Sequence, residues 1–255
     1  MTVMLVPELL AIDGEFFTRV LDREAIGGLT CVFSKELSES HFNRTLTLQG
    51  DEKLSGKTLR DMIERFQTRE RIPCIYLNLS GVDPHIIDLL LDFGFKRRDE
   101  TLSIMYAEEW NPVTPGPDES VNVGRIAKRD RRAWATVLSE ANGIQRTNLA
   151  ALERFYDRQV EAGAEMFLAR DDGKPVGTGT LVLSDGIAGI YNVATAESGR
   201  HRGVATALVE SMLRRARSSG LPVTLQAVTG SAGERLYKRF GFRTVSYTGM
   251  FLREI

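Results

Sequence analysis

Arg200-His201-Arg202-Gly203-Val204-Ala205 is the stretch that decides the fold, because it joins a strand-like run to a helical one through a basic turn. The run before it, residues 187–194, is apolar, and a helix is expected over residues 204–218. N–H groups at a helix start have no intrahelical partner, and the helix dipole adds positive potential there. Gly203 and Ala205 leave the backbone accessible, while Arg200 and Arg202 offer donors to phosphate oxygens. The sequence therefore predicts a diphosphate site.

The segments after this turn follow a regular order. Val204, Leu208 and Met212 repeat at helical spacing, and Gly220 and Pro222 end the helix. A strand is predicted over residues 223–228, then a short helix that contains residues 236–240, a Gly241-Phe242 corner and a last strand over residues 243–252.

This order resembles the GCN5-related N-acetyltransferase (GNAT) family over residues 120–255. Arg200, Gly203 and Ala205 match the acyl-CoA motif of that family, which reads Arg or Gln, two residues, Gly, one residue, then Gly or Ala. Leu236-Tyr237, followed by Gly241-Phe242, matches a second signature. The resemblance implies an α/β (α+β) fold with a mixed, mostly antiparallel sheet flanked by helices.

The chain also repeats itself on either side of a proline-rich segment. Residues 111–119 hold three prolines and a glycine and are predicted to be an extended linker. Phe93-Gly94-Phe95 before the linker matches Phe240-Gly241-Phe242 after it, each following a Pro-led strand and a short helix. We therefore expect two GNAT-like domains, at residues 1–110 and 120–255.

The two halves differ in chemistry. Where the second half has its basic turn, the first has Asp51-Glu52-Lys53-Leu54-Ser55-Gly56-Lys57, whose acids would repel a diphosphate. Leu90 stands where the second half has Tyr237. The first half is thus expected to keep the fold and to lack cofactor binding.

The resemblance implies an acyltransferase that passes an acetyl group from acetyl-CoA, its co-substrate, to a primary amine by direct attack. The backbone of Val193, Ala194 and Thr195 would bind the pantetheine arm like an added strand, and an N–H there could hold the developing oxyanion. Tyr237 would be the general acid that protonates the departing thiolate. The diphosphate would lie on the turn, formed by Arg200, His201, Arg202, Gly203, Val204, Ala205 and Thr206.

The general base is left open. Some relatives carry a glutamate on the strand before the turn, but this strand has no carboxylate and has Gly189 near that point. Asp185 and Glu197 flank the strand and could act through water, or the amine could arrive neutral. Gly230 and Gly233 replace an Asn and an Ala found in many relatives, which removes one side-chain contact near the CoA arm.

The acceptor is also left open, as a small-molecule amine or a peptide. Helices are expected at residues 131–141 and 148–162, which the resemblance places beside the acceptor. This would bring Trp134, Tyr156 and residues 145–148 near it, although buried aromatic residues at such positions commonly belong to the core. The oligomeric state stays open.

Composition excludes several classes of protein. With 42% hydrophobic and 26% charged residues the chain is typical of a globular protein, and no apolar run is long enough to cross a bilayer. Two cysteines, Cys31 and Cys74, and the absence of a signal-peptide pattern predict a cytoplasmic location. Residues 116–255 hold 20 Lys and Arg against 15 Asp and Glu, too scattered an excess to predict nucleic-acid binding. The three histidines lack metal-ligand spacing, so no metal is expected.

Two rival interpretations remain. Gly50 to Thr58 resembles a phosphate-binding P-loop after a predicted strand at residues 46–48, but five residues separate its glycines where the motif needs four. The other rival is an acyl-CoA-binding sensor or scaffold without turnover, which the missing base would explain.

Overall fold

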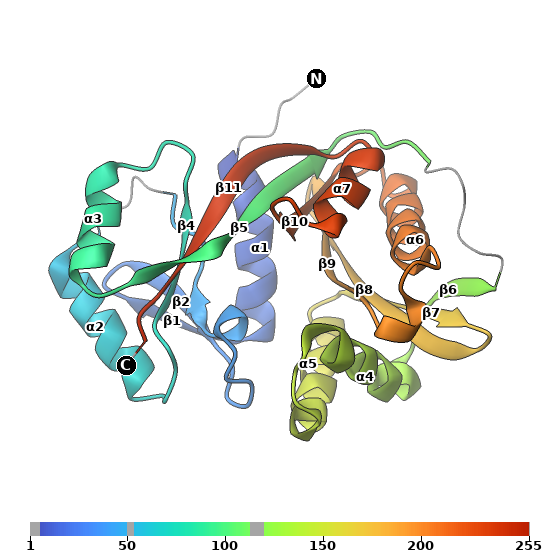
Figure 1. Cartoon of the computed structure of the whole chain (residues 1–255), viewed down its shortest axis with the longest axis horizontal. Helices are drawn as coiled ribbons and strands as arrows, with labels where there is room; N and C mark the ends of the chain where they lie inside the picture. Colours follow the sequence, from blue (N-terminus) through green and yellow to red (C-terminus); the bar gives the residue numbers. More distant parts are fainter. Residues whose placement is uncertain (1–5, 50–53, 113–119, 255) are drawn as a thin grey trace. The chain divides into compact units, whose positions relative to one another are not determined.

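The structure is a computed structural model that describes residues 6–49, 54–112 and 120–254 (Figure 1). Contacts divide the chain into two compact units. The first comprises Met1–Ile104, Ala227–Ser231 and Thr244–Ile255, and the second comprises Met105–Gln226 and Ala232–Arg243. The last residues of the chain, from Thr244, are thus grouped with the first unit, whereas the sequence predicts them to lie in the domain at residues 120–255. Most of the predicted linker lies outside the described residues.

The first unit is built from two sets of strands with helices. Strands β1, β2 and β3 form an antiparallel sheet, and β4 pairs antiparallel with β11. Its elements are α1 (Val6–Val20), β1 (Asp22–Ile26), β2 (Leu29–Phe33), β3 (Arg44–Thr45), α2 (Gly56–Gln67), β4 (Cys74–Asn78), α3 (Pro84–Asp92), most of β5 (Lys96–Ala107) and most of β11 (Arg243–Leu252).

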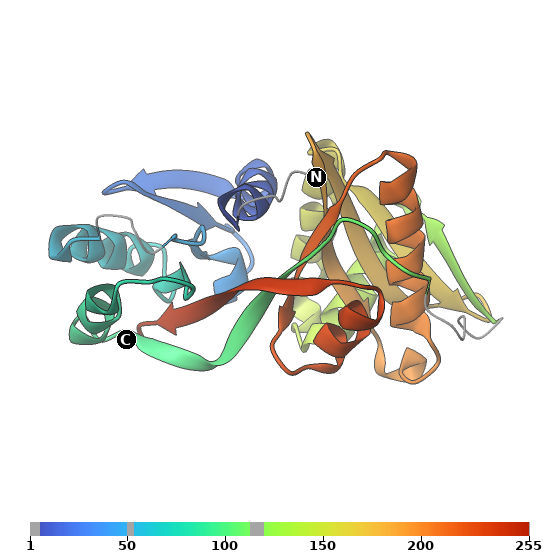
Figure 2. The ribbon, with the colours of Figure 1, turned by 90° about the horizontal axis from the view of Figure 1, so that it is seen from above.

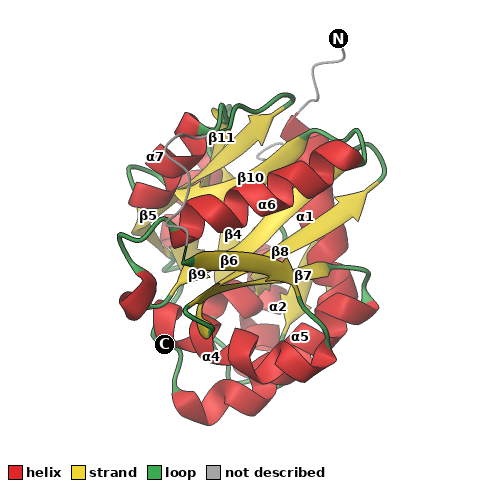
Figure 3. Cartoon of the chain, turned by 90° about the vertical axis from the view of Figure 1, so that its right-hand side faces the viewer, coloured by secondary structure: helices red, strands yellow, loops and turns green. Residues whose placement is uncertain are grey.

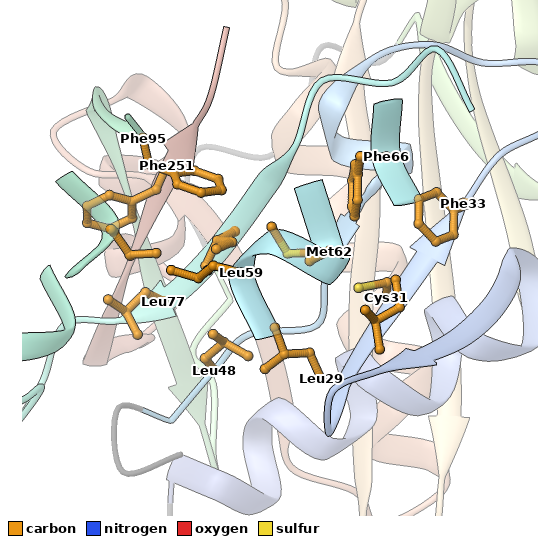
Figure 4. Packing of buried hydrophobic residues seen from close by; sticks show 13 residues of the cluster. Leu29, Cys31, Phe33, Leu48, Leu59, Met62, Phe66, Leu77, Phe95 and Phe251 are labelled. Atoms are coloured by element: carbon orange, nitrogen blue, oxygen red, sulfur yellow. The ribbon is translucent and has the colours of Figure 1, made fainter. Parts of the chain in front are cut away.

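Helix α2 supplies the centre of the first unit's core. Leu59, Met62 and Phe66 fall on one helical face and are fully buried. Figure 4 shows them together with Phe33 of β2 and Phe251 of β11. Each such side chain contributes about 1.5–3 kcal/mol when it leaves water. The last strand of the chain is therefore part of the first unit's core.

In the second unit, β10, β9, β8, β7 and β6 are neighbours in this order within one sheet, and helices cover both faces. Strands β9 and β10 are parallel, and the other neighbours are antiparallel. Its elements are β6 (Val121–Arg125), α4 (Arg131–Asn142), α5 (Leu149–Glu161), β7 (Glu165–Asp171), β8 (Lys174–Ser184), β9 (Ile187–Thr195), α6 (Val204–Ser218), β10 (Val223–Val228, its end in the first unit) and α7 (Ala232–Arg239).

Strand β8 shows how the two faces of this sheet are covered. An added Cβ at Gly177 or Gly179 would meet side chains of α6, whereas Thr180 bonds to Gln159 of α5. Because neighbouring strand residues point to opposite faces, α6 lies on one face and the α4–α5 pair on the other (Figures 2 and 3). The observed fold is the mixed α/β architecture that the sequence predicted.

The two halves share one helix ending. Gly94 and Gly241 have positive φ angles, and their N–H groups donate to the residue three positions earlier, Leu91 or Lys238. The N–H groups of Phe95 and Phe242 both donate five residues back. The order helix, strand, short helix, Gly-Phe corner, strand therefore occurs twice, as α2-β4-α3-β5 and α6-β10-α7-β11.

The strand predicted at residues 46–48 is not formed. The Leu46 N–H donates to the Thr30 carbonyl, whereas the Leu48 N–H donates to the Tyr76 carbonyl. Leu48 forms only an isolated β-bridge with Leu77. The chain passes from β2 to β4 within these residues, so no continuous ladder can form. No helix in the described ranges combines the length and apolar character needed to cross a membrane.

Candidate active site

The predicted anion site lies where β9 turns into α6. A short 3₁₀ turn at Glu197–Gly199 is followed by His201 and Gly203, both with positive φ angles. Gly203 is the N-cap, and its carbonyl accepts the N–H of Ala207. The N–H groups of residues 204–206 precede this first helical bond, so they have no acceptor within the helix. They provide main-chain donors at the positive end of the dipole.

Glycine on β8 brings the start of α6 close to the sheet. A Cβ at Gly177 would lie 2.5 Å from Val204 Cγ1 and 2.8 Å from Leu208 Cδ1, too near for any side chain there. Gly199 is similarly close to Val176. These contacts fix the first turn of α6 against β8 and thus set the position of its donors.

A pocket of about 740 Å³ opens at this turn. Its wall is positively charged, and no Asp or Glu is among the lining residues. Side chains of Arg200, His201 and Arg239 have no ion-pair partner among the described residues. The lining consists of Thr195, Gly199, Arg200, His201, Arg202, Gly203, Val204, Ala205, Thr206, Ala232, Gly233, Leu236 and Arg239.

The structure thus brings together Thr195 and residues 200–206 from the predicted set. Val193 and Ala194 lie on β9 just before the pocket and do not line it. Arg239 was missed, because it is distant in sequence and resembles the other cations that end helices. Only the fold brings the end of α7 to the pocket.

Arg202 lines the pocket and also forms side-chain contacts with β7. Its guanidinium forms an ion pair with the buried carboxylate of Asp171 and donates to Ser120 Oγ at 3.3 Å. Ser120 Oγ in turn donates to Asp171 at 2.7 Å. Arg202 therefore ties the turn to the end of β7, whereas Arg200 and Arg239 have no such ion pair in the described part of the chain. A phosphate contact by Arg202 stays a prediction.

Strands β9 and β10 separate beside the pocket. Their pairing covers Ala188, Gly189 and Ile190 of β9 against Val223 to Leu225 of β10. From Tyr191 onward, β9 does not pair with β10, although both strands continue within the described part of the chain. The edge of β9 at residues 193–195 is therefore available for main-chain bonds with an extended ligand.

Tyr237 is buried, with 7% of its surface exposed, and its ring meets Phe242 edge to face at 6.0 Å. Burial raises the pKa of its hydroxyl above the ordinary value, so the phenol is protonated at neutral pH. It does not line the pocket, although Leu236 beside it does. Its hydroxyl can thus donate a proton, but the structure does not bring it to the phosphate end of the site.

The ring of Tyr191 covers Gly189, which lies near the point where a glutamate is expected in some relatives. A Cβ at Gly189 would lie 2.6 Å from the ring of Tyr191 and 2.9 Å from its hydroxyl oxygen. A side chain at Gly189 would therefore have to displace the Tyr191 ring. Asp185 and Glu197 are exposed at the ends of the strand.

The aromatic residues predicted near the acceptor belong to the core. Trp134 and Tyr156 are fully buried and meet edge to face at 5.5 Å. Burial raises the pKa of Tyr156 to about 12. Residues 146–148 form a 3₁₀ turn before α5, in which Arg146 and Thr147 are exposed and Asn148 is half-buried. Their place near the acceptor stays a prediction.

The corresponding helix start in the first unit, that of α2, is capped by the side chain of Ser55. Ser55 Oγ accepts a hydrogen bond from the N–H of Thr58 at 3.1 Å, and Thr58 itself is buried. Asp51 and Glu52 lie outside the described residues. In the described ranges, no group of three or more His, Cys, Asp or Glu side chains is arranged to hold a metal ion.

Comparisons with known proteins agree with this fold. The sequence pattern of the family described as "Acetyltransferase (GNAT) family" matches residues 132–242. A GCN5-related N-acetyltransferase from Kribbella flavida superposes with a TM-score of 0.71 at 15% identity, covering 100% of this chain and 97% of that one. No curated protein matches the sequence.

Two further solved structures are similar over most of the chain. A tandem GNAT protein from the clavulanic acid biosynthesis pathway has a TM-score of 0.61 at 13% identity, covering 89% of this chain and 78% of that one. A GCN5-related N-acetyltransferase from Sphaerobacter thermophilus has a TM-score of 0.59 at 18% identity, covering 89% and 76%. At these identities the likeness concerns the fold, and the chain has the fold of the GNAT acetyltransferases.

Proposed function

We propose that this protein is an N-acetyltransferase that moves an acetyl group from acetyl-CoA to a primary amine by direct attack. The observation that carries the proposal is the positively charged pocket at the start of α6, next to the unpaired edge of β9. A diphosphate would accept bonds from the N–H groups of residues 203–206, with Arg200 and Arg239 as counter-charges. The pantetheine arm would run along residues 193–195.

In this proposal the chain supplies position and protons. Acetyl-CoA brings the activated acetyl group, and a main-chain N–H of residues 193–195 stabilises the charge that develops on the thioester oxygen. Tyr237, kept protonated by burial, donates its proton to the thiolate that leaves. The first unit, with its capped α2, is a GNAT-like domain that has lost cofactor binding. The amine acceptor is a small molecule or a peptide.

The missing carboxylate favours one second candidate, a protein that binds acyl-CoA without turnover. It arises because position 189 is a glycine covered by the Tyr191 ring, so no carboxylate stands there. The two candidates differ in one measurement. An acetyltransferase releases CoA thiol with at least one member of an amine library, whereas a sensor binds acetyl-CoA and releases none.

Acetyl-CoA binding is tested by substituting Ala205, a half-buried residue in the first turn of α6. A carboxylate there suits the helix dipole, so Ala205→Asp should remain folded. About 6 Å from a diphosphate charge it would repel the ligand by about 3 kcal/mol at an effective dielectric constant of about 20. Calorimetric titration should show an affinity about 100-fold lower.

Ala205→Ser is the matched control, since it is small and uncharged and should bind as the wild type does. Equal affinity of the Asp variant and the Ser variant would place the diphosphate elsewhere. Wild-type protein that binds no acetyl-CoA would overturn the proposed function.

A further inference from the structure

Asn192 has an unusual backbone in the middle of β9. Its φ angle is 53°. Among the described non-glycine residues with a positive φ, Asn192 alone lies inside a strand. Asn tolerates this conformation better than most residues. Thr180 pairs with Tyr191 and Thr178 with Ala194, so Asn192 and Val193 together face the single residue Gly179. Asn192 is therefore the extra residue of a β-bulge.

A buried polar network holds this bulge. The Asn192 side-chain amide donates to Gln159 Oε1 at 2.8 Å and to Thr180 Oγ1 at 3.1 Å. Its backbone carbonyl accepts the Thr178 hydroxyl at 2.9 Å. Gln159, Thr178 and Thr180 are completely buried. A bond broken here would leave a buried polar group without its partner, which is costly, so the network restricts Asn192 to one conformation.

The bulge lies where β9 stops pairing with β10. The last β9–β10 pair is Ile190 with Leu225, two residues before Asn192, and Thr195, three residues after it, lines the pocket. A bulge bends its strand and changes the direction of the residues that follow. The conformation of Asn192 thus sets where the main-chain groups of residues 193–195 point.

We propose that Asn192 is a positioning residue, whose left-handed backbone is locked by Gln159 and Thr180 and directs residues 193–195 toward the pantetheine arm of CoA. This inference rests on the proposed function, because it concerns the same ligand. It assigns to α5, through Gln159, a part in shaping the thioester end of the site. Asn192 itself acts through the backbone that follows it.

The test compares two ligands, CoA and its nucleotide half, adenosine 3′-phosphate 5′-diphosphate. The nucleotide reaches only the turn at residues 200–206, whereas CoA also uses residues 193–195. Asn192→Ala should therefore lower the affinity for CoA about 10-fold and leave the affinity for the nucleotide unchanged. In turnover, kcat should fall by on the order of 100-fold, because a misplacement of about 1 Å at a reacting group has such an effect.

Two further variants separate backbone from side chain. Asn192→Gly keeps access to positive φ but loses the amide, and should lose CoA affinity and kcat to a smaller degree than Asn192→Ala. Ser139→Ala removes another buried hydrogen bond of this unit, to the Ile144 carbonyl at 2.8 Å, and should change neither ligand's affinity.

The outcomes are distinct. Wild type that binds neither ligand overturns the proposed function itself. If the wild type prefers CoA to the nucleotide and both Asn192 variants keep that preference and the wild-type kcat, the positioning role is overturned while the proposed function stands. Should Asn192→Ala not fold, the Gly variant alone decides, since wild-type ligand preference and kcat in it would refute the anchoring by Gln159 and Thr180.

Discussion

Replacing Gly177 by Ala should displace the start of α6 and weaken acetyl-CoA binding. The new Cβ would lie 2.5 Å from Val204 Cγ1 and 2.8 Å from Leu208 Cδ1, whereas relaxed carbon contacts are about 3.5–4.0 Å. Gly177 has no positive φ, so the backbone itself tolerates Ala. Val204 is β-branched and cannot turn away freely. Relief therefore requires α6 to move outward by about 1 Å, estimated from the gap to a relaxed contact.

The expected cost follows from this overlap. Overpacking of a core contact costs about 1–3 kcal/mol, and the loss of glycine entropy in the unfolded state offsets about 0.4–1 kcal/mol of it. The middle of these ranges leaves a net loss of about 1.3 kcal/mol, so for a chain of this size we expect Tm to fall by about 3–5 °C. The donors of the first helical turn move with Val204, so acetyl-CoA affinity should fall by on the order of 10-fold, about 1.4 kcal/mol.

Gly179→Ala is the matched control, on the same face of β8 two residues along. Its Cβ would meet Met212 Cε at 2.7 Å and Sδ at 2.9 Å, the end of a flexible side chain far from the helix start. Differential scanning calorimetry and calorimetric titration should show a smaller loss of Tm and unchanged affinity. If Gly177→Ala binds acetyl-CoA as tightly as Gly179→Ala does, the close packing of Val204 does not position the site.

Two other predictions concern ionisable groups. Tyr237→Phe should lower kcat by about 10²–10⁴-fold with little change in acetyl-CoA affinity, and an unchanged kcat would remove Tyr237 from the mechanism. Because burial raises the Tyr237 pKa and a general acid acts when protonated, wild-type kcat should not decline on the alkaline side until above about pH 10, the ordinary tyrosine value. Burial also raises the pKa of Cys31 and Cys74 to about 12, so native protein should not react with Ellman's reagent at pH 8, and two thiols should react after denaturation. Rapid labelling of the native protein would contradict the burial of these side chains.

Local patterns in the sequence predicted the second half of the chain well. The bounds of α6, β10 and β11 follow from helical spacing, from Gly220 and Pro222, and from the Gly241-Phe242 corner. In the hairpin between β7 and β8, Asp172 and Gly173 both have positive φ angles, as the tight turn favoured by an Asp-Gly pair requires. In each case the determining residues are neighbours in the chain.

Elements that depend on distant partners could not be predicted in the same way. The last strand pairs with β4, where Thr248 faces Asn78, and Phe251 enters the core of the first unit. The apolar pattern of β11 identifies a strand but not the neighbour against which it packs. Likewise β5 extends from Lys96, although its first five residues are charged and exposed, because strand pairing rather than burial forms that part.

The candidate site also has one part that adjacent residues specify and another that distant residues form. Its proposed anion-binding part is made of main-chain donors and a glycine, which a few adjacent residues specify, so the motif at residues 200–205 could predict it. The groups that orient the site come together only in the fold. Asn192 needs Gln159, 33 residues away, and the charge of Arg202 is taken by Asp171. An Asn in an apolar strand was the one available signal, and its meaning depended on the left-handed backbone that only the structure reveals. The proposed phosphate site is thus predictable from adjacent residues, whereas the proposed geometry at the thioester depends on tertiary contacts.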